Sequence, residues 1–155
     1  MVYSIILLIH SYLRWLVLGS LLAALASAYS GLLRPRLYRP ADQTIRVVAT
    51  SIAHTQLLIG IYLYTISPII RYYWQNRSGF GESPQFSFFA LIHIGLMLAA
   101  VIIITIGSSK AKRQIDAREQ FKTTATYFTI GLLLILLAIP WPFSPLATRP
   151  WLRTF

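Results

Sequence analysis

The sequence predicts an all-α protein, a single integral membrane domain (residues 1–155) in which four transmembrane helices form an up-down-up-down bundle. Three observations support this prediction. Hydrophobic residues make up 56% of the chain and charged residues only 12%, which leaves too little polar surface for a soluble domain of this length. Four predominantly apolar segments are each long enough to cross a bilayer, which takes about 20 residues. The acidic residues all lie outside these segments.

The first two predicted spans are residues 3–33 and 44–67. The first is longer than a crossing requires, so we expect it to tilt or to project from one face of the bilayer. The sequence RPR at 34–36 closes it. Asp42 or Thr44 is a candidate cap for the second span, which Pro68 interrupts near its end.

The third and fourth predicted spans are residues 86–108 and 122–140. Gly95 and Ala99 resemble a small-residue packing seam in the third span, and the sequence PWP at 140–142 stops the fourth. Between the second and third spans, residues 72–86 are polar and contain two glycines. We interpret them as an external loop, and the alternative is a lid over an outward-facing site.

Basic residues in the short connections predict the orientation of the bundle. The segments 34–46 and 110–122 hold nine Lys and Arg residues, four in the first and five in the second, whereas the other connection and the C-terminal tail together hold four. Both basic loops are therefore expected in the cytoplasm and both termini outside. An aromatic belt is then expected at the outer surface, formed by Tyr72, Tyr73, Trp74, Trp141 and Trp151.

Composition also limits the chemistry. The net charge of +10 falls between apolar segments, so membrane topology explains it more simply than nucleic-acid binding does, and no nucleic-acid partner is expected. The chain has no cysteine, which excludes disulfides, thiolate-ligated iron–sulfur clusters and covalent CxxCH haem attachment.

Three histidines and one arginine lie well inside the predicted spans, away from the span ends: His10, Arg14, His54 and His93. Ionisable groups at membrane depth are costly, and they mark candidate functional sites. At about 1.5 Å of rise per residue, His10 and His93 both lie roughly 10 Å below the outer ends of their spans. In a four-helix bundle the first and third helices lie on a diagonal, roughly 12–14 Å apart. This separation suits two histidines that bind one haem iron from opposite sides, so we predict one bis-histidine haem b with His10 and His93 as axial ligands.

Arg14 follows His10 by four residues and shares its helix face. No carboxylate of the chain is expected at its depth. A haem propionate, a quinone oxygen, buried water or backbone carbonyls are the candidate partners of its guanidinium. His54, near the middle of the second span, lies at a depth similar to that of Arg14. It is a candidate for hydrogen bonding to a quinone or for proton transfer.

Simpler interpretations stand beside these. A histidine in a membrane helix can serve only as an interhelical hydrogen-bond group, and Arg14 can serve only as a structural clamp. On that basis the alternatives are a haem-free accessory subunit of a larger respiratory membrane complex and a small transporter or sensor.

Several segments together resemble a known group of proteins. These are 10–16 (HSYLRWL), 54–60 (HTQLLIG), 104–110 (ITIGSSK, after His93) and 139–143 (IPWPF). With these segments the chain is similar, over nearly its whole length, to small bacterial four-helix membrane proteins labelled "cytochrome B".

The resemblance implies a b-type haem protein of the bacterial inner membrane that takes part in respiratory electron transfer. Two bis-histidine haems would need four histidines and the chain has three, so one haem per chain is expected. Because so little of the chain lies outside the predicted spans, we expect an electron-transfer subunit rather than a self-contained enzyme. Other membrane subunits, or further copies of the chain, are the expected protein partners.

Overall fold

The computed structural model describes residues 2–76 and 84–152. In these residues the regular structure is entirely helical, as the sequence predicts. The elements are α1 (Val2–Leu33), α2 (Pro40–Ile66), α3 (Pro68–Gln75), α4 (Pro84–Ser87), the π-helical turn η2 (Phe88–His93), α5 (Ile94–Arg113) and α6 (Ala117–Ala138). Four helical stretches are long and apolar enough to cross a membrane: α1, α2, the continuous run Pro84–Arg113 and α6. The chain is thus a multi-pass membrane protein with four helices in its bundle.

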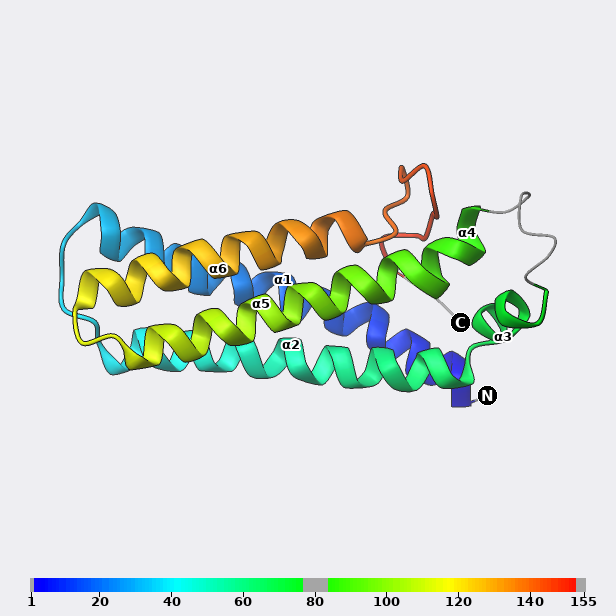
Figure 1. Cartoon of the computed structure of the whole chain (residues 1–155), viewed down its shortest axis with the longest axis horizontal. Coiled ribbons are helices and arrows are strands. Elements are labelled where there is room, and N and C mark those ends of the chain that lie inside the picture. The colour runs from blue at the N-terminus through cyan, green and yellow to red at the C-terminus, as the bar shows by residue number, and fades with distance from the viewer. Residues whose placement is uncertain (1, 77–83, 153–155) are drawn as a thin grey trace.

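The four long helices lie side by side in alternating directions (Figure 1). α1 packs against α2 and α6, and α5 packs against the same two helices, so α1 and α5 occupy one diagonal of the bundle. One end of the bundle holds the start of α1 and the end of α6, and we call it the terminal end (Figure 1). The connections from α1 to α2 and from α5 to α6 lie at the opposite end.

Prolines set several helix boundaries. A residue that precedes proline is pushed out of the helical region, and Arg39, Ser67 and Ile139 are all extended, with ψ of 158°, 125° and 128°. α2 consequently begins at Pro40, four residues before the predicted start. The predicted cap at Asp42 or Thr44 was wrong, because Arg39 is the N-cap residue. Asp42 instead accepts the Arg39 backbone N–H at 2.9 Å from inside the first turn.

Two other boundaries differ from the prediction. α6 begins at Ala117 rather than at 122 because the side chain of Asp116 caps it, accepting the backbone N–H of Glu119 at 2.9 Å. Residues 72–75 belong to helix α3 and residues 84–86 to helix α4, so the interpretation of 72–86 as a loop was wrong at both ends. Residues 77–83 of that connection lie outside the described residues.

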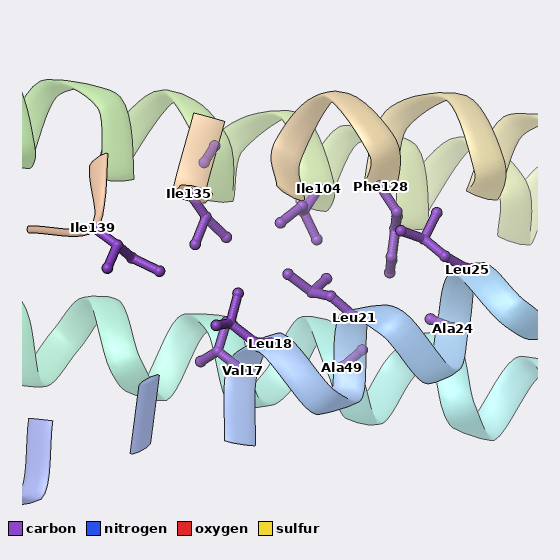
Figure 2. Packing of buried hydrophobic residues seen from close by; sticks show 11 residues of the cluster. Val17, Leu18, Leu21, Ala24, Leu25, Ala49, Ile104, Phe128, Ile135 and Ile139 are labelled. Atoms are coloured by element: carbon purple, nitrogen blue, oxygen red, sulfur yellow. The ribbon is translucent and has the colours of Figure 1, made fainter. Parts of the chain in front are cut away.

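The core lies in the middle of the bundle, where α1, α5 and α6 meet (Figure 2). Leu21, Ile104 and Phe128 are fully buried there. Gly131 lets α6 approach closely, since a Cβ at this position would lie 2.5 Å from Cγ1 of Ile104. The seam predicted at Gly95 is not the contact that joins α5 to α6. Gly95 is exposed, and a Cβ at its position would meet no other described element within 4 Å.

The third span contains one irregularity that the sequence did not predict. Residues 88–93 form a π-helical turn that leads directly into α5. At its end the backbone N–H of Ile94 bonds to the Leu91 carbonyl. The Tyr64 hydroxyl of α2 donates to the Ala90 carbonyl at 3.1 Å. Because π-helical turns occur often at functional sites, this turn draws attention to His93, its last residue.

Candidate functional site

His10 and His93 face each other across the diagonal of the bundle. Their ring centroids are 6.5 Å apart and their ring planes make an angle of 72°. His10 comes from α1 and His93 from the end of η2, so the two rings approach each other from helices that lie on opposite corners. The structure thus brings together the two residues predicted as axial ligands, at one level of the bundle.

The His93 ring has a fixed tautomer. Its Nδ1 lies 2.8 Å from the carbonyl oxygen of Ala138, the last residue of α6. A carbonyl only accepts hydrogen bonds, so Nδ1 carries the proton and the lone pair remains on Nε2. This arrangement leaves Nε2 of His93 as the atom that can bind a metal.

The Ala138 carbonyl is available because of the prolines that follow α6. In a continued helix it would accept from residue 142, and the carbonyl of Leu136 would accept from residue 140. Both of these residues are prolines and carry no N–H. The two carbonyls bind side chains instead: Ala138 accepts from His93, and Leu136 accepts from Nε1 of Trp141 at 2.8 Å. The sequence IPWPF therefore both ends α6 and supplies the partner of His93.

The His10 ring lies against the backbone of α2. A Cβ at Gly60 would lie 3.1 Å from Cε1 of His10 and 3.8 Å from its Nδ1, so this edge of the ring faces the glycine. One turn earlier on α2, Gln56 donates from Nε2 to the backbone carbonyl of His10 at 2.9 Å. Sequence reasoning missed Gln56, because no pattern in the second span indicates a contact with His10.

Two adjoining cavities meet at the histidine pair. One lies toward α2 and α3 and the other toward the segment that follows α6. Eight residues line both cavities: Leu7, His10, Arg14, Gln56, Phe89, His93, Met97 and Arg149. None of the described lining residues is Asp or Glu, whereas two of them, Arg14 and Arg149, are arginines.

Arg14 finds a partner in its own chain. The C-terminal segment returns along the terminal end of α1, and the Trp151 carbonyl accepts from Nη2 of Arg14 at 2.9 Å and from Nε1 of Trp15 at 3.3 Å. A backbone carbonyl was one of the partners expected for Arg14, and it carries no charge to neutralise the guanidinium. Arg149, which sequence reasoning missed, joins the site from the same returning segment, with its Cζ 4.9 Å from the Phe89 ring centre.

The same return brings aromatic rings together. Trp151 lies against Trp15 and Trp141, with centroids 6.1 and 5.4 Å away, and Phe143 stacks on Trp141 at 6.0 Å. Trp141 and Trp151 were expected in an aromatic belt at the membrane surface. In the structure they form a cluster with Trp15 that fastens the C-terminal segment to α1, and their place in such a belt stays a prediction.

His54 lies apart from the histidine pair. Its Nε2 is 2.8 Å from Oγ1 of Thr105 on α5, and this hydroxyl donates to the Val101 carbonyl at 2.6 Å. The hydroxyl hydrogen is therefore engaged, and Nε2 of His54 is the donor in an interhelical hydrogen bond. His54 does not line either cavity, so the structure does not bring it together with Arg14.

Over residues 2–76 and 84–152 there is no cluster of three or more His, Cys, Asp or Glu side chains that could hold a metal ion. The histidine pair thus offers two candidate ligand side chains. Comparison of the chain with protein-family models, with curated proteins and with solved structures gives no match.

Proposed function

We propose that this chain is a b-type cytochrome of a bacterial inner membrane, which binds one haem b between His10 and His93 and relays electrons in a respiratory chain. The observation that carries the proposal is the pair of facing imidazoles, with centroids 6.5 Å apart, on the diagonal helices of the bundle.

This separation fits a pair of axial ligands. A metal–imidazole bond is about 2 Å long and a ring nitrogen lies about 1 Å from the ring centre, so two axial imidazoles have centroids roughly 6 Å apart. The angle of 72° between the ring planes is compatible with this arrangement, because both planes can contain the line that joins the two nitrogens.

The number of ligands favours haem over a bare metal ion. A bare zinc ion in a structural site takes four ligands, and among the His, Cys, Asp and Glu side chains of the described residues only two meet in this site. A porphyrin brings four nitrogens of its own and needs two axial ligands from the protein. When bound, the haem supplies an iron centre that takes up and releases one electron.

The second contact of His93 also suits an axial ligand. Metal-ligating histidines usually donate their other ring N–H to a carbonyl or carboxylate, which fixes the ring and raises its basicity. The bond from Nδ1 of His93 to the Ala138 carbonyl has this form.

The two arginines are the candidate partners of the propionates. Arg14 and Arg149 both line the two cavities that meet at the histidines, where the described lining offers no acidic side chain. Arginine matches a carboxylate in both charge and geometry.

We further propose that the terminal end of the bundle faces outward, because the two basic connections, 34–46 and 110–122, then lie in the cytoplasm. The haem would lie in the outer half of the membrane, where another membrane subunit, a further copy of the chain or a quinone could exchange electrons with it. His54 stays a predicted quinone or proton group, and its bond to Thr105 supports the simpler structural role.

The test is a reduced-minus-oxidised spectrum of the protein purified in mild detergent with haem supplied during expression. We expect one low-spin haem b per chain, abolished in His10→Ala and in His93→Ala and retained in His54→Ala. Absence of a haem band from the folded wild-type protein would refute the proposal. Retention of low-spin haem in His93→Ala would refute the ligand assignment.

The second candidate is a haem-free accessory subunit. It is favoured by the bonds from His93 to Ala138, from His54 to Thr105 and from Arg14 to Trp151, which already connect different elements without a ligand. Under that function the spectrum shows no haem, and substitution of each polar residue lowers stability only.

A further inference from the structure

Three buried polar side-chain atoms in the described part of the chain have no hydrogen-bond partner: Nδ1 of His10, Nε of Arg14 and Oε1 of Gln56. The three residues that carry them line the same two cavities. Because an unsatisfied buried polar group is costly, their gathering at one place indicates an interaction that is completed when the site is filled.

Gln56 is already held beside His10. Its Nε2 donates to the backbone carbonyl of His10 at 2.9 Å, which fixes the amide group at this level of α1. The His10 ring turns its Nδ1 and Cε1 edge toward Gly60, which follows Gln56 by four residues and so shares its helix face. Oε1 of Gln56 and Nδ1 of His10, which both lack a hydrogen-bond partner, therefore lie on the same side of the ring.

The two atoms are also chemically complementary. The Gln56 oxygen is an acceptor, because the other amide atom is already used as a donor. Nδ1 of a neutral imidazole is a donor when it carries the proton.

We infer that Gln56 is the positioning residue of His10, with its Oε1 accepting the Nδ1–H of His10 directly or through one bridging water. This inference rests on the proposed haem site. His10 would then match His93: each ring has its Nδ1–H held by an oxygen, from Gln56 in one case and from Ala138 in the other. In both rings the lone pair of Nε2 would point to the iron.

The tautomer of His10 can be measured without haem. In haem-free protein labelled with ¹⁵N-histidine, at alkaline pH where the imidazoles are neutral, three ring signal sets are expected, and single His→Asn variants assign them. We expect the Nδ1–H tautomer for His10 in the wild type. Gln56→Met, which keeps the length but not the acceptor, should shift His10 toward the Nε2–H form, whereas Gln56→Glu, which keeps an acceptor oxygen, should not.

Gln43→Met is the matched control, because Gln43 is an exposed glutamine on the same helix. It should leave all three signal sets unchanged. A His10 ring that is in the Nε2–H form in the wild type, or that has the same tautomer in Gln56→Met as in the wild type, would overturn the inference.

The haem-loaded protein gives a second measurement. Loss of the acceptor lowers the basicity of the ligand, so Gln56→Met should retain low-spin haem with a more positive midpoint potential. Gln56→Glu should shift the potential the other way. A missing haem band in the wild type would refute the proposed function, whereas a haem whose potential is the same in the wild type and in Gln56→Met would refute only the role of Gln56.

Discussion

Nδ1 of His93 lies 2.8 Å from the carbonyl oxygen of Ala138, so a residue of the third span is oriented by the end of the fourth. The prolines at 140 and 142 make this possible, because neither can supply the N–H that a longer helix would offer to the last carbonyls of α6. The end of α6 and the direction of the His93 ring therefore have the same cause.

Replacing Pro140 and Pro142 should separate the end of α6 from the direction of the His93 ring. In the double variant Pro140→Ala/Pro142→Ala we expect α6 to continue, so that the Ala138 carbonyl bonds to the N–H of residue 142 and releases His93. The ¹⁵N signals of His93 should then lose the Nδ1–H pattern, and less low-spin haem should be retained. Pro145→Ala, at an exposed position of the same segment, is the control and should change neither measurement. An unchanged His93 tautomer in the double variant would contradict this explanation.

Gly60 should set the position of the His10 ring. A Cβ at this position would lie 3.1 Å from Cε1, so Gly60→Ala requires the ring to move by a few tenths of an ångström, and Gly60→Val requires more. We expect haem retention to fall from the wild type through Gly60→Ala to Gly60→Val.

Gly95→Ala is the matched control for Gly60, because the described residues leave open space around Gly95. It should retain haem and gain about 1 kcal/mol of stability from helix propensity. Full haem retention in Gly60→Val would show that the ring does not depend on this close approach.

The crossing of α5 and α6 should tolerate no side chain at Gly131. Its Cβ would lie 2.5 Å from Cγ1 of Ile104 and 3.4 Å from the backbone oxygen of Ala100, so the helices would have to separate. We expect Gly131→Leu to lower the free energy of unfolding by about 1–3 kcal/mol in a detergent denaturation series. Gly19→Leu, at an exposed position of α1 with open space among the described residues, should have little effect.

Hydropathy and proline positions predicted the architecture because both depend on residues that are close together in the sequence. A span must be apolar over a fixed length, and a residue before proline leaves the helix, so Leu33 and Ile66 end their helices close to the predicted positions. The facing of His10 and His93 followed from the same reasoning, since depth and helix order fix which residues share a level.

The rest of the site depends on contacts that leave no pattern in the sequence. Arg149 and the Trp151 carbonyl reach the site only because the C-terminal segment folds back onto α1, and this segment has no helical periodicity to reveal its path. The contact of Gln56 with the His10 carbonyl depends on the exact rotation of α2. A π-helical turn adds only one residue to one turn of the helix. The hydropathy and the length of the span therefore do not reveal it.

That π-helical turn can itself be tested through Tyr64. Its hydroxyl donates to the Ala90 carbonyl at 3.1 Å and accepts from Nε1 of Trp74 at 3.1 Å, so it binds a carbonyl of the π-helical turn from α2. In Tyr64→Phe this buried carbonyl loses a donor, which costs about 1 kcal/mol and favours a regular α-helix over residues 88–93. A regular helix would rotate His93 about 100° around the helix axis relative to the turns before it, away from its present orientation toward His10.

We therefore expect Tyr64→Phe to lower the fraction of low-spin haem while the far-ultraviolet circular dichroism stays close to that of the wild type. Tyr62→Phe is the matched control, because Tyr62 is an exposed tyrosine two residues earlier on the same helix. It should keep the wild-type haem content. If both variants retain haem equally, the π-helical turn does not need the Tyr64 hydroxyl. The orientation of His93 would then depend on the Ala138 carbonyl alone.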